Sequence, residues 1–500
     1  MTLTRRGPLR AALGAAAVVL ERKVDAPISL AAVMPPSTQA QPGTEDTTRA
    51  KGIRVREVVL VVLLLAGLAF AGASPAPADA GADGLSVVGV QKLSPRMSEL
   101  TVRSNVLLGD VPMRVILPSD YDADQSRRFP VLYMLPGTSQ TPAMVTDSVD
   151  LETFTANTPV IIVIPSGGNG SYYTNWFNGG LFGPPEWETF HLSQVIPYID
   201  AHYRTVADRS GRAISGISMG GFGSMSYAAR HPDLFAAAVS FSGAVNTNYP
   251  PQMAVTTESA ENDNGAPDSE FGPRATEEVR WRGHNPVDLA ENLRGVDVQI
   301  LAHNGLPGGS YEITGDPLEY GVHQESSDLH DRLAALGVPH AWYDLGPGGH
   351  VPGDIQTEIH IALPHVMSVF EHPAPAPDEF TYESIEPEFS VWDWSFRADP
   401  ARAMEFLRVQ DASASGLTLV GSGETMVTTA PLFAKARAVD VVQRGQTRSV
   451  RPDASGRIRF DVELGSPHHV QQFTAQARIS DQPPVSTHVT LVAHKRRPRH

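Results

Sequence analysis

Ser218 stands in the sequence Gly216-Ile217-Ser218-Met219-Gly220, a spacing typical of a nucleophilic serine. The short apolar run 212–215 before it predicts a buried strand, and the stretch 219–230 after it predicts a helix that ends before His231-Pro232. A strand, a sharp turn and a helix with serine at the apex form a nucleophile elbow, in which small glycines let strand and helix approach closely. We therefore predict that Ser218 attacks a carbonyl carbon.

The serine hydroxyl needs a base to take its proton, and the base needs an acid to orient it. Around an elbow of this kind the partners follow in the order Ser, then Asp or Glu, then His. His350 closes the glycine-rich loop 346–350, directly after the apolar run 341–345, so we predict that it is the base. His360 and His365 fall in a helical segment and are expected to be surface or packing residues.

Spacing alone does not decide which carboxylate orients the histidine. The strand-like run 298–302 leads into a loop where an aspartate often follows, but none is present here. Glu319 opens a helix-like stretch towards Leu336, which ranks it slightly above Asp316. The carboxylates downstream of the loop are Glu312, Asp316, Glu319, Glu325 and Asp328.

Two backbone N–H groups are also required, aimed at the oxyanion that develops on the attacked carbonyl. The residue after the nucleophile, Met219, supplies one. The second is expected from the loop 135–139. Because Pro136 has no N–H, Gly137 or Thr138 must donate, and we predict Thr138.

The elements around these residues alternate between strand and helix from about Leu85 to Phe370. Near-continuous apolar strands alternating with amphipathic helices predict a mostly parallel sheet covered on both faces, here an α/β-hydrolase fold over 85–370. A hairpin is expected first, over 98–106 and 113–117. The buried strands are predicted at 130–135, 159–164, 213–215, 236–241, 298–302 and 341–345, and the helices at 188–203, 219–230 and 326–336.

A second domain is predicted after the Pro-rich linker 371–377, because alternating proline makes such a segment stiff. Over 378–500 the pattern changes to short alternating segments separated by Gly, Asp and Pro, which favours a small all-β, sandwich-like domain. The expected strands are 388–396, 417–420, 426–429, 457–462 and 487–492.

The N-terminal region predicts export. Within 54–80, Arg54 and Arg56 precede an apolar run at 58–71 and then small residues, as in a secretory signal peptide. Because the run is shorter than the ~20 residues of a comfortable membrane span, we expect a cleaved signal, and a retained N-terminal anchor is the alternative. Residues 1–53 before it are expected to be a non-structural or mis-assigned extension.

Composition narrows the function classes. The formal charge of −16 argues against nucleic acid as a partner, since phosphate binding needs a basic surface; the basic ending 495–500 is a local exception. The absence of cysteine excludes disulfides, a thiol nucleophile and cysteine-ligated metals. The predicted chemistry needs no metal or other cofactor, and His303 and His323 near the acid loop are expected to be incidental.

Across about residues 90–370 the chain resembles the antigen 85 mycolyltransferases, within the wider esterase D-like group. The resemblance rests on 131–137, Tyr172-Tyr173-Thr174-Asn175-Trp176, Trp187-Glu188-Thr189-Phe190, the elbow, His303-Asn304-Gly305-Leu306-Pro307 and Gly349-His350. In that family the acid is a glutamate that begins the helix after an Asn-Gly-x-Pro loop, which implies Glu319 rather than Asp316. The family also places oxyanion donors at the positions of Thr138 and Met219.

The chain departs from that family at the first oxyanion loop, where Pro136 and Ser139 replace an Asp and an Arg used around the sugar headgroup. The family's paired cysteines are replaced by 178–182, and its Ser-Trp after the histidine by Val351-Pro352. The resemblance implies an envelope acyltransferase or esterase acting on lipid or acyl-sugar esters, without specifying trehalose. A simple carboxylesterase and a non-catalytic envelope-binding protein, attached through the C-terminal domain, are the alternatives.

Overall fold

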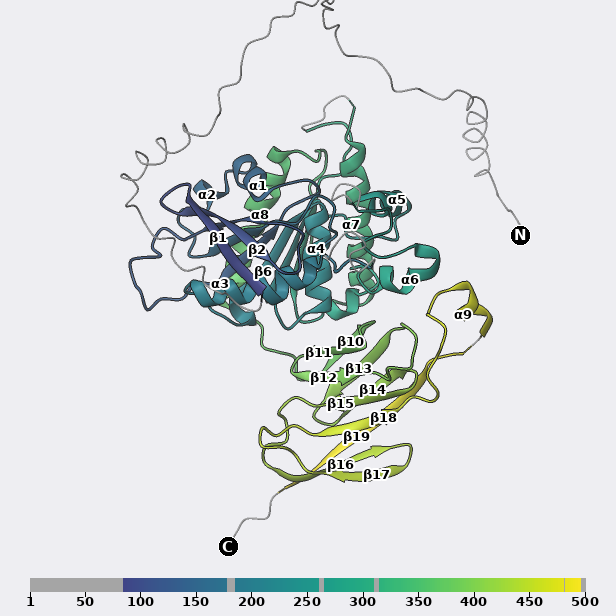
Figure 1. The fold of residues 1–500 in the computed structure, drawn as a ribbon. Coiled ribbons are helices and arrows are strands. Elements are labelled where there is room, and N and C mark those ends of the chain that lie inside the picture. The colour runs from purple at the N-terminus through teal and green to yellow at the C-terminus, as the bar shows by residue number, and fades with distance from the viewer. Residues whose placement is uncertain (1–83, 178–184, 260–264, 310–313, 481, 496–500) are drawn as a thin grey trace, which may run out of the picture. The chain divides into compact units, whose positions relative to one another are not determined.

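The computed structural model describes residues 84–177, 185–259, 265–309, 314–480 and 482–495 (Figure 1). Several predictions from the sequence lie outside these residues. They are the N-terminal extension 1–53, the signal peptide 54–80, the substituted segment 178–182, Glu312, and the basic ending beyond residue 495.

A nine-stranded sheet forms the centre of the region from Leu85 to Glu371. Its strands are β1 (Leu85–Lys92), β2 (Met97–Ser104), β3 (Val111–Ile116), β4 (Val131–Leu135), β5 (Ile161–Pro165), β6 (Arg212–Ile217), β7 (Ala237–Phe241), β8 (Asp297–Ala302) and β9 (Ala341–Asp344). They are ordered β1-β2-β3-β5-β4-β6-β7-β8-β9. The pairs from β1 to β5 are antiparallel, and those from β5 through β4 to β9 are parallel. The predicted hairpin and mostly parallel sheet are confirmed.

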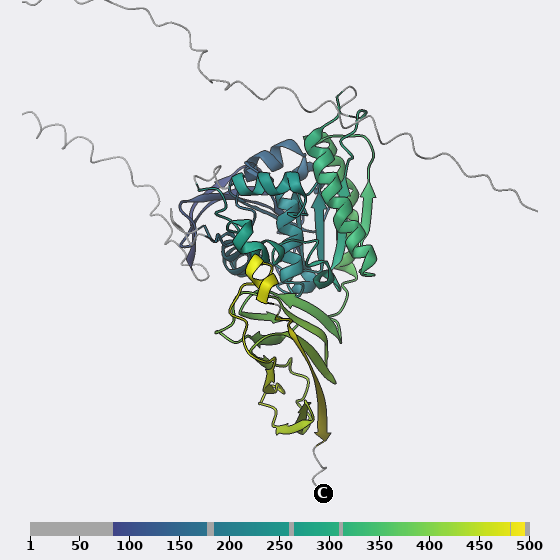
Figure 2. The ribbon, with the colours of Figure 1, turned by 90° about the vertical axis from the view of Figure 1, so that its right-hand side faces the viewer.

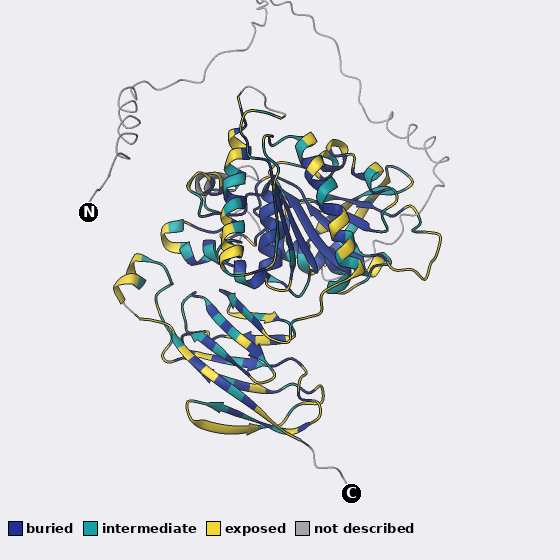
Figure 3. Ribbon diagram, turned by 180° about the vertical axis from the view of Figure 1, so that it is seen from behind, coloured by how far each residue is buried: buried dark blue, intermediate teal, exposed yellow. Residues whose placement is uncertain are grey.

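Helices cover both faces of this sheet (Figure 2). Alternate residues of one strand belong to different apolar clusters: Tyr133 and Leu135 pack with α4, whereas Leu132 and Met134 pack with α8. The central strands are therefore buried along their whole length, as Figure 3 shows. The helices are α1 (Pro142–Ser148), α2 (Leu151–Phe154), α3 (Ile196–His202), α4 (Met219–Arg230), α5 (Pro250–Ser259), α6 (Arg274–Arg282), α7 (Pro317–Ala335) and α8 (Pro352–Glu371).

The helix predicted over 188–203 is divided in two. A π-helical segment, Thr189–Val195, precedes α3. Pro197 lies at the junction and has no N–H to donate to the carbonyl of Ser193, as an unbroken α-helix would require. Sequence reasoning also missed β1, α1, α2, α5 and α6, all at the edges of the sheet or in its connections.

The C-terminal region consists of two antiparallel sheets that share one apolar core. The six-stranded sheet is ordered β10-β13-β14-β19-β16-β17 and the four-stranded sheet β11-β12-β15-β18. This confirms the all-β, sandwich-like prediction. The strands are β10 (Phe380–Ser384), β11 (Glu388–Val391), β12 (Trp394–Arg397), β13 (Leu407–Ser413), β14 (Gly416–Gly421), β15 (Glu424–Thr428), β16 (Ala436–Gln443), β17 (Gln446–Val450), β18 (Arg459–Glu463) and β19 (Val485–Lys495), with one short helix, α9 (Ala475–Ser480).

The single strand predicted over 388–396 is wrong. It is a hairpin of β11 and β12, in which Val391 pairs with Trp394. Trp392 and Asp393 form its turn with φ of 50° and 66°, the left-handed pair that a tight hairpin uses. Neither residue is glycine, so the usual turn signal was absent.

A buried ion-pair cluster fixes the far end of α4. Glu188, from the Trp-Glu-Thr-Phe block, lies 3.2 Å from Arg230 and 2.8 Å from His231. Burial alone would raise the pKa of Glu188, but Arg230 and His231 outweigh it and lower the pKa to about 2. Arg230 also pairs with Glu386 of the C-terminal region at 2.8 Å, and its carbonyl accepts a hydrogen bond from Tyr382. The block thus anchors the helix that carries the elbow.

We predict that Glu188→Gln lowers the free energy of unfolding at neutral pH by about 3 kcal/mol, because it deprives the buried Arg230 of the more deeply buried of its two acidic partners. A carboxyl group whose pKa is lowered on folding stabilises the folded protein at pH values above the pKa of glutamate in the unfolded chain. This stabilisation is lost as the pH falls towards the pKa of the group in the folded protein. The difference from wild type should therefore shrink as pH falls towards about 2.

Urea unfolding at several pH values measures this. Glu388→Gln is the matched control, because Glu388 pairs with Arg397 at the surface with 60% of its side chain exposed. An equal effect of the two substitutions would contradict the prediction.

Candidate active site

Ser218 occupies the turn between β6 and α4 with φ of 57° and ψ of −118°. Non-glycine residues rarely adopt such a backbone, and it persists only where the surroundings enforce it. Those surroundings are glycines: a Cβ on Gly216 would collide with the Gly220 carbonyl, and one on Gly220 with the Leu135 carbonyl. Strand β4, strand β6 and helix α4 therefore meet backbone to backbone under Ser218.

His350 and Glu319 are in direct contact. The His350 Nδ1 lies 2.8 Å from the Glu319 Oε2, and the Glu319 side chain is fully buried. Because a carboxylate only accepts, Nδ1 carries the proton and Nε2 is left as the basic nitrogen. His350 is partly buried, with 14% of its side chain exposed.

Asp316, the competing acid, binds backbone instead of the imidazole. Its side chain caps α7 by accepting from the N–H groups of Leu318 and Glu319. Its Oδ2 also accepts from the His350 backbone N–H at 2.7 Å. Asp316 thus binds the backbone at the start of α7 and in the histidine loop, while Glu319 binds the ring nitrogen of His350.

The second oxygen of Glu319, Oε1, accepts from the His303 backbone N–H at 2.9 Å and lies 2.7 Å from the Ser242 Oγ. His303 and Ser242 directly follow the ends of β8 and β7. Since the carboxyl ends of parallel strands meet at one edge, the sheet brings these groups and the elbow together. Among the described residues, the Ser218 hydroxyl makes no hydrogen bond to His350, and such bonds often tighten only when substrate is bound.

The loop after β4 leaves one N–H unused. The Gly137 N–H donates to the Gln140 side chain at 2.8 Å, and the Ser139 N–H donates to the Asn169 carbonyl at 3.0 Å. For the Thr138 N–H the described residues provide no partner. Tyr173, from the Tyr-Tyr block, supports the loop by donating to the Pro136 carbonyl at 2.6 Å. At the start of α4, the Met219 N–H likewise has no partner within the described part of the chain, as is usual for first helical residues.

The remaining predicted carboxylates and histidines lie apart from this contact. Glu325 accepts from the Asn246 backbone N–H, and burial raises its pKa well above the usual range. Asp328 accepts from the Asn246 side chain. His323 lies 3.4 Å from Asp344, His360 stacks on Phe154, and His365 pairs with Asp297. No cluster of three or more metal-ligating side chains occurs within the described part of the chain.

Sequence reasoning missed Ser242 and Glu358. Ser242 Oγ lies 2.7 Å from Oε1 of both Glu319 and Glu358, and Glu358 is fully buried. Glu358 was detectable, because it stands with Ile355, Ile359 and Ala362 on the apolar face of α8. A carboxyl group on a core-facing stripe is unusual and indicates a specific partner.

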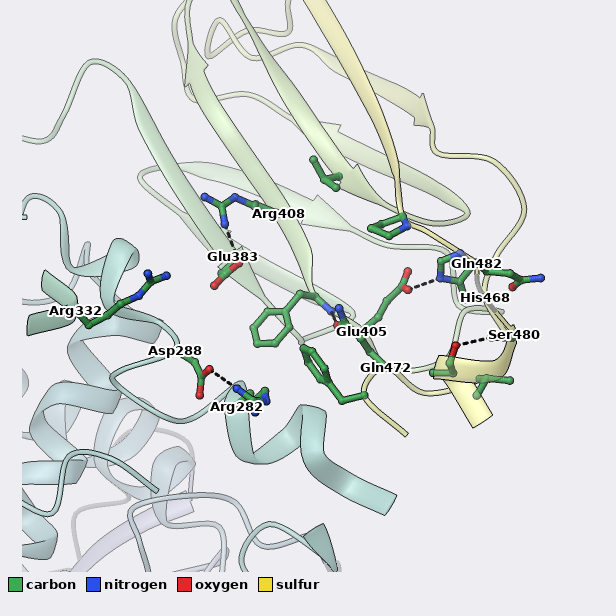
Figure 4. Close-up of a pocket in the computed structure, with 16 residues that line it drawn as sticks. Arg282, Asp288, Arg332, Glu383, Glu405, Arg408, His468, Gln472, Ser480 and Gln482 are labelled. Carbon is green, nitrogen blue, oxygen red and sulfur yellow. Dashed lines mark hydrogen bonds and ion pairs between the residues drawn. The ribbon is translucent and has the colours of Figure 1, made fainter. Parts of the chain in front are cut away.

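A cavity of about 390 Å³ lies elsewhere, between α6, α7 and the C-terminal sheets (Figure 4). None of Ser218, Glu319 and His350 lines it. Two of its arginines are paired with acids: Arg282 lies 2.8 Å from Asp288, and Arg408 lies 3.6 Å from Glu383. The elbow and this cavity are therefore separate features.

The family model described as "Putative esterase" matches residues 104–361, just over half of the chain. The chain belongs to this esterase family. The matched residues include the elbow, the Glu319–His350 pair and the loop after β4. The region from β10 to β19 lies beyond the match.

Several named proteins are similar to this chain. Esterase Rv1288 of Mycobacterium tuberculosis is 32% identical over 273 residues, covering 54% of this chain and 58% of its own length. The diacylglycerol acyltransferase/mycolyltransferase Ag85B of Mycobacterium leprae is 28% identical over 198 residues, covering 38% and 59%. The solved structure of Mycobacterium tuberculosis MPT51 is 21% identical with a TM-score of 0.45, covering 54% and 97%.

The chain spans about three fifths of the length of the curated relatives it matches. The resemblance to the antigen 85 mycolyltransferases is confirmed as a family relationship. Within the described residues, no helix combines the length and the apolar character needed to cross a membrane.

We predict that Gly220→Ala in this member of the esterase family unfolds the elbow or prevents folding, because its Cβ would meet backbone atoms that cannot move aside. The expected loss of stability is more than about 3 kcal/mol. Thermal unfolding of the purified variants measures it.

The matched control is Gly353→Ala. Gly353 lies in the first turn of α8, where no atom stands within 4 Å of a built Cβ. Alanine should be neutral or slightly stabilising there, because it restricts the unfolded chain. Similar stabilities for the two variants would show that the elbow tolerates a side chain.

Proposed function

We propose that this chain is an exported serine esterase or acyltransferase. It would act on carboxylic esters of lipids or acyl sugars through Ser218, His350 and Glu319. The single observation that supports this most strongly is the 2.8 Å contact between Glu319 and His350 at the sheet edge that carries the strained Ser218 elbow. Membership of the esterase family agrees with the same chemistry.

In the proposed first step, the Ser218 Oγ attacks the ester carbonyl and its proton passes to the His350 Nε2. The carbonyl π electrons move onto oxygen, giving a tetrahedral intermediate. Its collapse breaks the bond to the leaving alcohol, which takes the proton back from His350. An acyl-Ser218 ester remains.

In the second step, His350 takes a proton from water or from an acceptor hydroxyl, which attacks the acyl carbon. Collapse returns the proton to Ser218 and releases a free acid or a new ester. Glu319 stays ionised throughout and stabilises the imidazolium, which is the role of a buried triad acid.

The oxyanion would be held by the backbone N–H groups of Thr138 and Met219. Both lack an internal partner among the described residues, and they come from the two sides of Ser218. A preorganised pair of this kind costs no reorganisation when charge develops.

The acceptor decides between esterase and transferase. The relatives' names include both an esterase and a mycolyltransferase. Pro136 and Ser139 replace the acidic and basic residues that the mycolyltransferases use around the sugar, and the Ser139 N–H is already bonded to Asn169. We therefore propose an ester-cleaving or acyl-transferring enzyme that does not require trehalose, exported by the predicted signal and in contact with the cell envelope through its C-terminal domain.

We predict that the wild-type protein hydrolyses p-nitrophenyl esters and that Ser218→Ala lowers kcat/KM by at least about a thousandfold, because the nucleophile is lost. An ester series of increasing chain length, assayed with and without trehalose, measures both donor and acceptor preference. Release of free acid regardless of trehalose is expected.

An inactive wild-type protein across the series would favour the alternative of a non-catalytic envelope-binding protein. Equal activity of Ser218→Ala would disprove the nucleophile. Acylated trehalose formed at the expense of free acid would identify a transferase.

We predict that Glu319→Gln lowers kcat by about a thousandfold or more, because an amide no longer stabilises the imidazolium. Asp316→Asn serves as the matched comparison, since it removes a neighbouring carboxylate that contacts only backbone N–H groups. Its kcat should fall by about tenfold or less, with some loss of thermal stability from the weakened helix cap. Reversed magnitudes would assign the acid to Asp316.

A further inference from the structure

Ser242 bridges two buried carboxyl groups. Its Oγ lies 2.7 Å from Oε1 of Glu319 and 2.7 Å from Oε1 of Glu358. Glu319, Glu358 and Ser242 are all fully buried. The bridge therefore lies behind the Glu319–His350 contact, on the side away from the ring.

The number of protons at this bridge shows whether both glutamates can be ionised. A serine hydroxyl has one hydrogen, so it can donate to only one of the two oxygens. The other short contact must be a carboxylic acid O–H that donates to the Ser242 Oγ, because two bare oxygens at this distance would repel each other. One of the two glutamates is therefore neutral.

Glu358 is the neutral one. Glu319 already receives the His303 N–H and faces the Nδ1–H of His350, so its oxygens are solvated as an anion. The second oxygen of Glu358, Oε2, is buried and has no hydrogen-bond partner among the described residues. Burying an ionised carboxylate oxygen without a hydrogen bond costs free energy, whereas burying a protonated, neutral carboxyl group at this position costs much less.

We propose that Glu358 is a protonated positioning residue that donates through Ser242 to Glu319 and so orients the acid of the triad without adding a second negative charge. The chain of donors runs from Glu358 to Ser242 to Glu319, and from His350 to Glu319 on the other side. This inference rests on the function proposed above for its catalytic consequence only. The protonation of Glu358 is a property of the fold.

The charges around Glu358 agree with a neutral carboxyl. Burial raises its pKa well above the usual glutamate range, and the negative charges of Glu319 on α7 and Asp354 on α8 raise it further. Hydrogen bonding to Ser242 acts in the opposite direction and is outweighed. The histidines around this cluster are His350, which contacts the other oxygen of Glu319, His303, whose backbone N–H binds Glu319, and His360, two residues along α8.

The first test is independent of activity. A carboxyl whose pKa is raised on folding binds more protons in the native than in the unfolded state, so wild-type stability falls as pH rises above the unfolded glutamate value. Glu358→Gln removes this dependence and keeps a neutral donor. Its melting temperature relative to wild type should therefore rise steadily between about pH 4 and pH 8.

Glu371→Gln is the control for this measurement, since Glu371 ends the same helix and is exposed. The melting temperature of Glu371→Gln relative to wild type should not rise with pH in the same way. A difference between Glu358→Gln and wild type that is constant with pH, or that falls as pH rises, would overturn the protonation of Glu358.

The second test concerns positioning. Glu358→Met and Ser242→Ala remove the donor chain and should each lower kcat by about tenfold with little change in KM. Glu358→Gln should rescue most of that loss and keep the pH profile of kcat/KM. Circular dichroism checks that each variant is folded.

In Glu358→Gln, the acid limb of the pH profile of kcat/KM could shift by more than about half a pH unit. Such a shift would show that Glu358 carries a charge that acts on His350, and would overturn the proposal. Full activity of folded Glu358→Met would also overturn it. If the wild-type enzyme proves inactive on every ester, the proposed function fails, while the melting-temperature comparison still decides the state of Glu358.

Discussion

The close approach of α4 to the central sheet is the constraint on which the rest of the site depends. Gly216 and Gly220 let the helix start touch the backbone of β6 and of the loop after β4. In this arrangement Ser218 adopts a φ of 57°, and Met219 becomes the first residue of α4. The ion pairs of Glu188 at the other end of α4 then fix the helix along its length. The backbone of Ser218, the start of α4 and the position of this helix are thus all set by the same close packing.

Burying the acid creates a second requirement, because an ionised carboxylate in a core must be fully hydrogen-bonded. The fold meets it at the ends of β7 and β8, which supply the Ser242 hydroxyl and the His303 N–H to Glu319. Asp316 is used for a different task, holding the backbone of the histidine loop. Two acids three residues apart on one helix start thereby have separate roles, which follow from the direction of each side chain.

Much of the fold was predictable because buried parallel strands leave a strong apolar signal, and β4 to β8 were placed within two residues. The elements that were missed, such as β1 and α6, lie at edges where alternation is weaker, and the β11–β12 turn lacks glycine. At the site, the order of motifs predicted Ser218 and His350, but spacing could not separate Glu319 from Asp316 because both lie at the start of α7. Glu358 could have been found as a carboxyl group on the apolar face of α8. Its contact with Ser242 could not, since the two residues are more than 100 positions apart in the sequence.

The loop after β4 shows how specificity can change while the chemistry is kept. Its main chain is fixed by bonds that do not involve substrate: Gly137 to Gln140, Ser139 to Asn169, and Tyr173 to Pro136. The backbone donor at Thr138 is therefore set by the fold, whereas the exposed side chains of Thr138 and Ser139 are free to vary. A family member can thus vary the side chain at Ser139 without disturbing the main chain of the loop. Because charged groups recognise sugar hydroxyls through strong hydrogen bonds, we propose that their loss in this loop alters the acceptor side of the proposed reaction and leaves the proposed acyl-enzyme step intact.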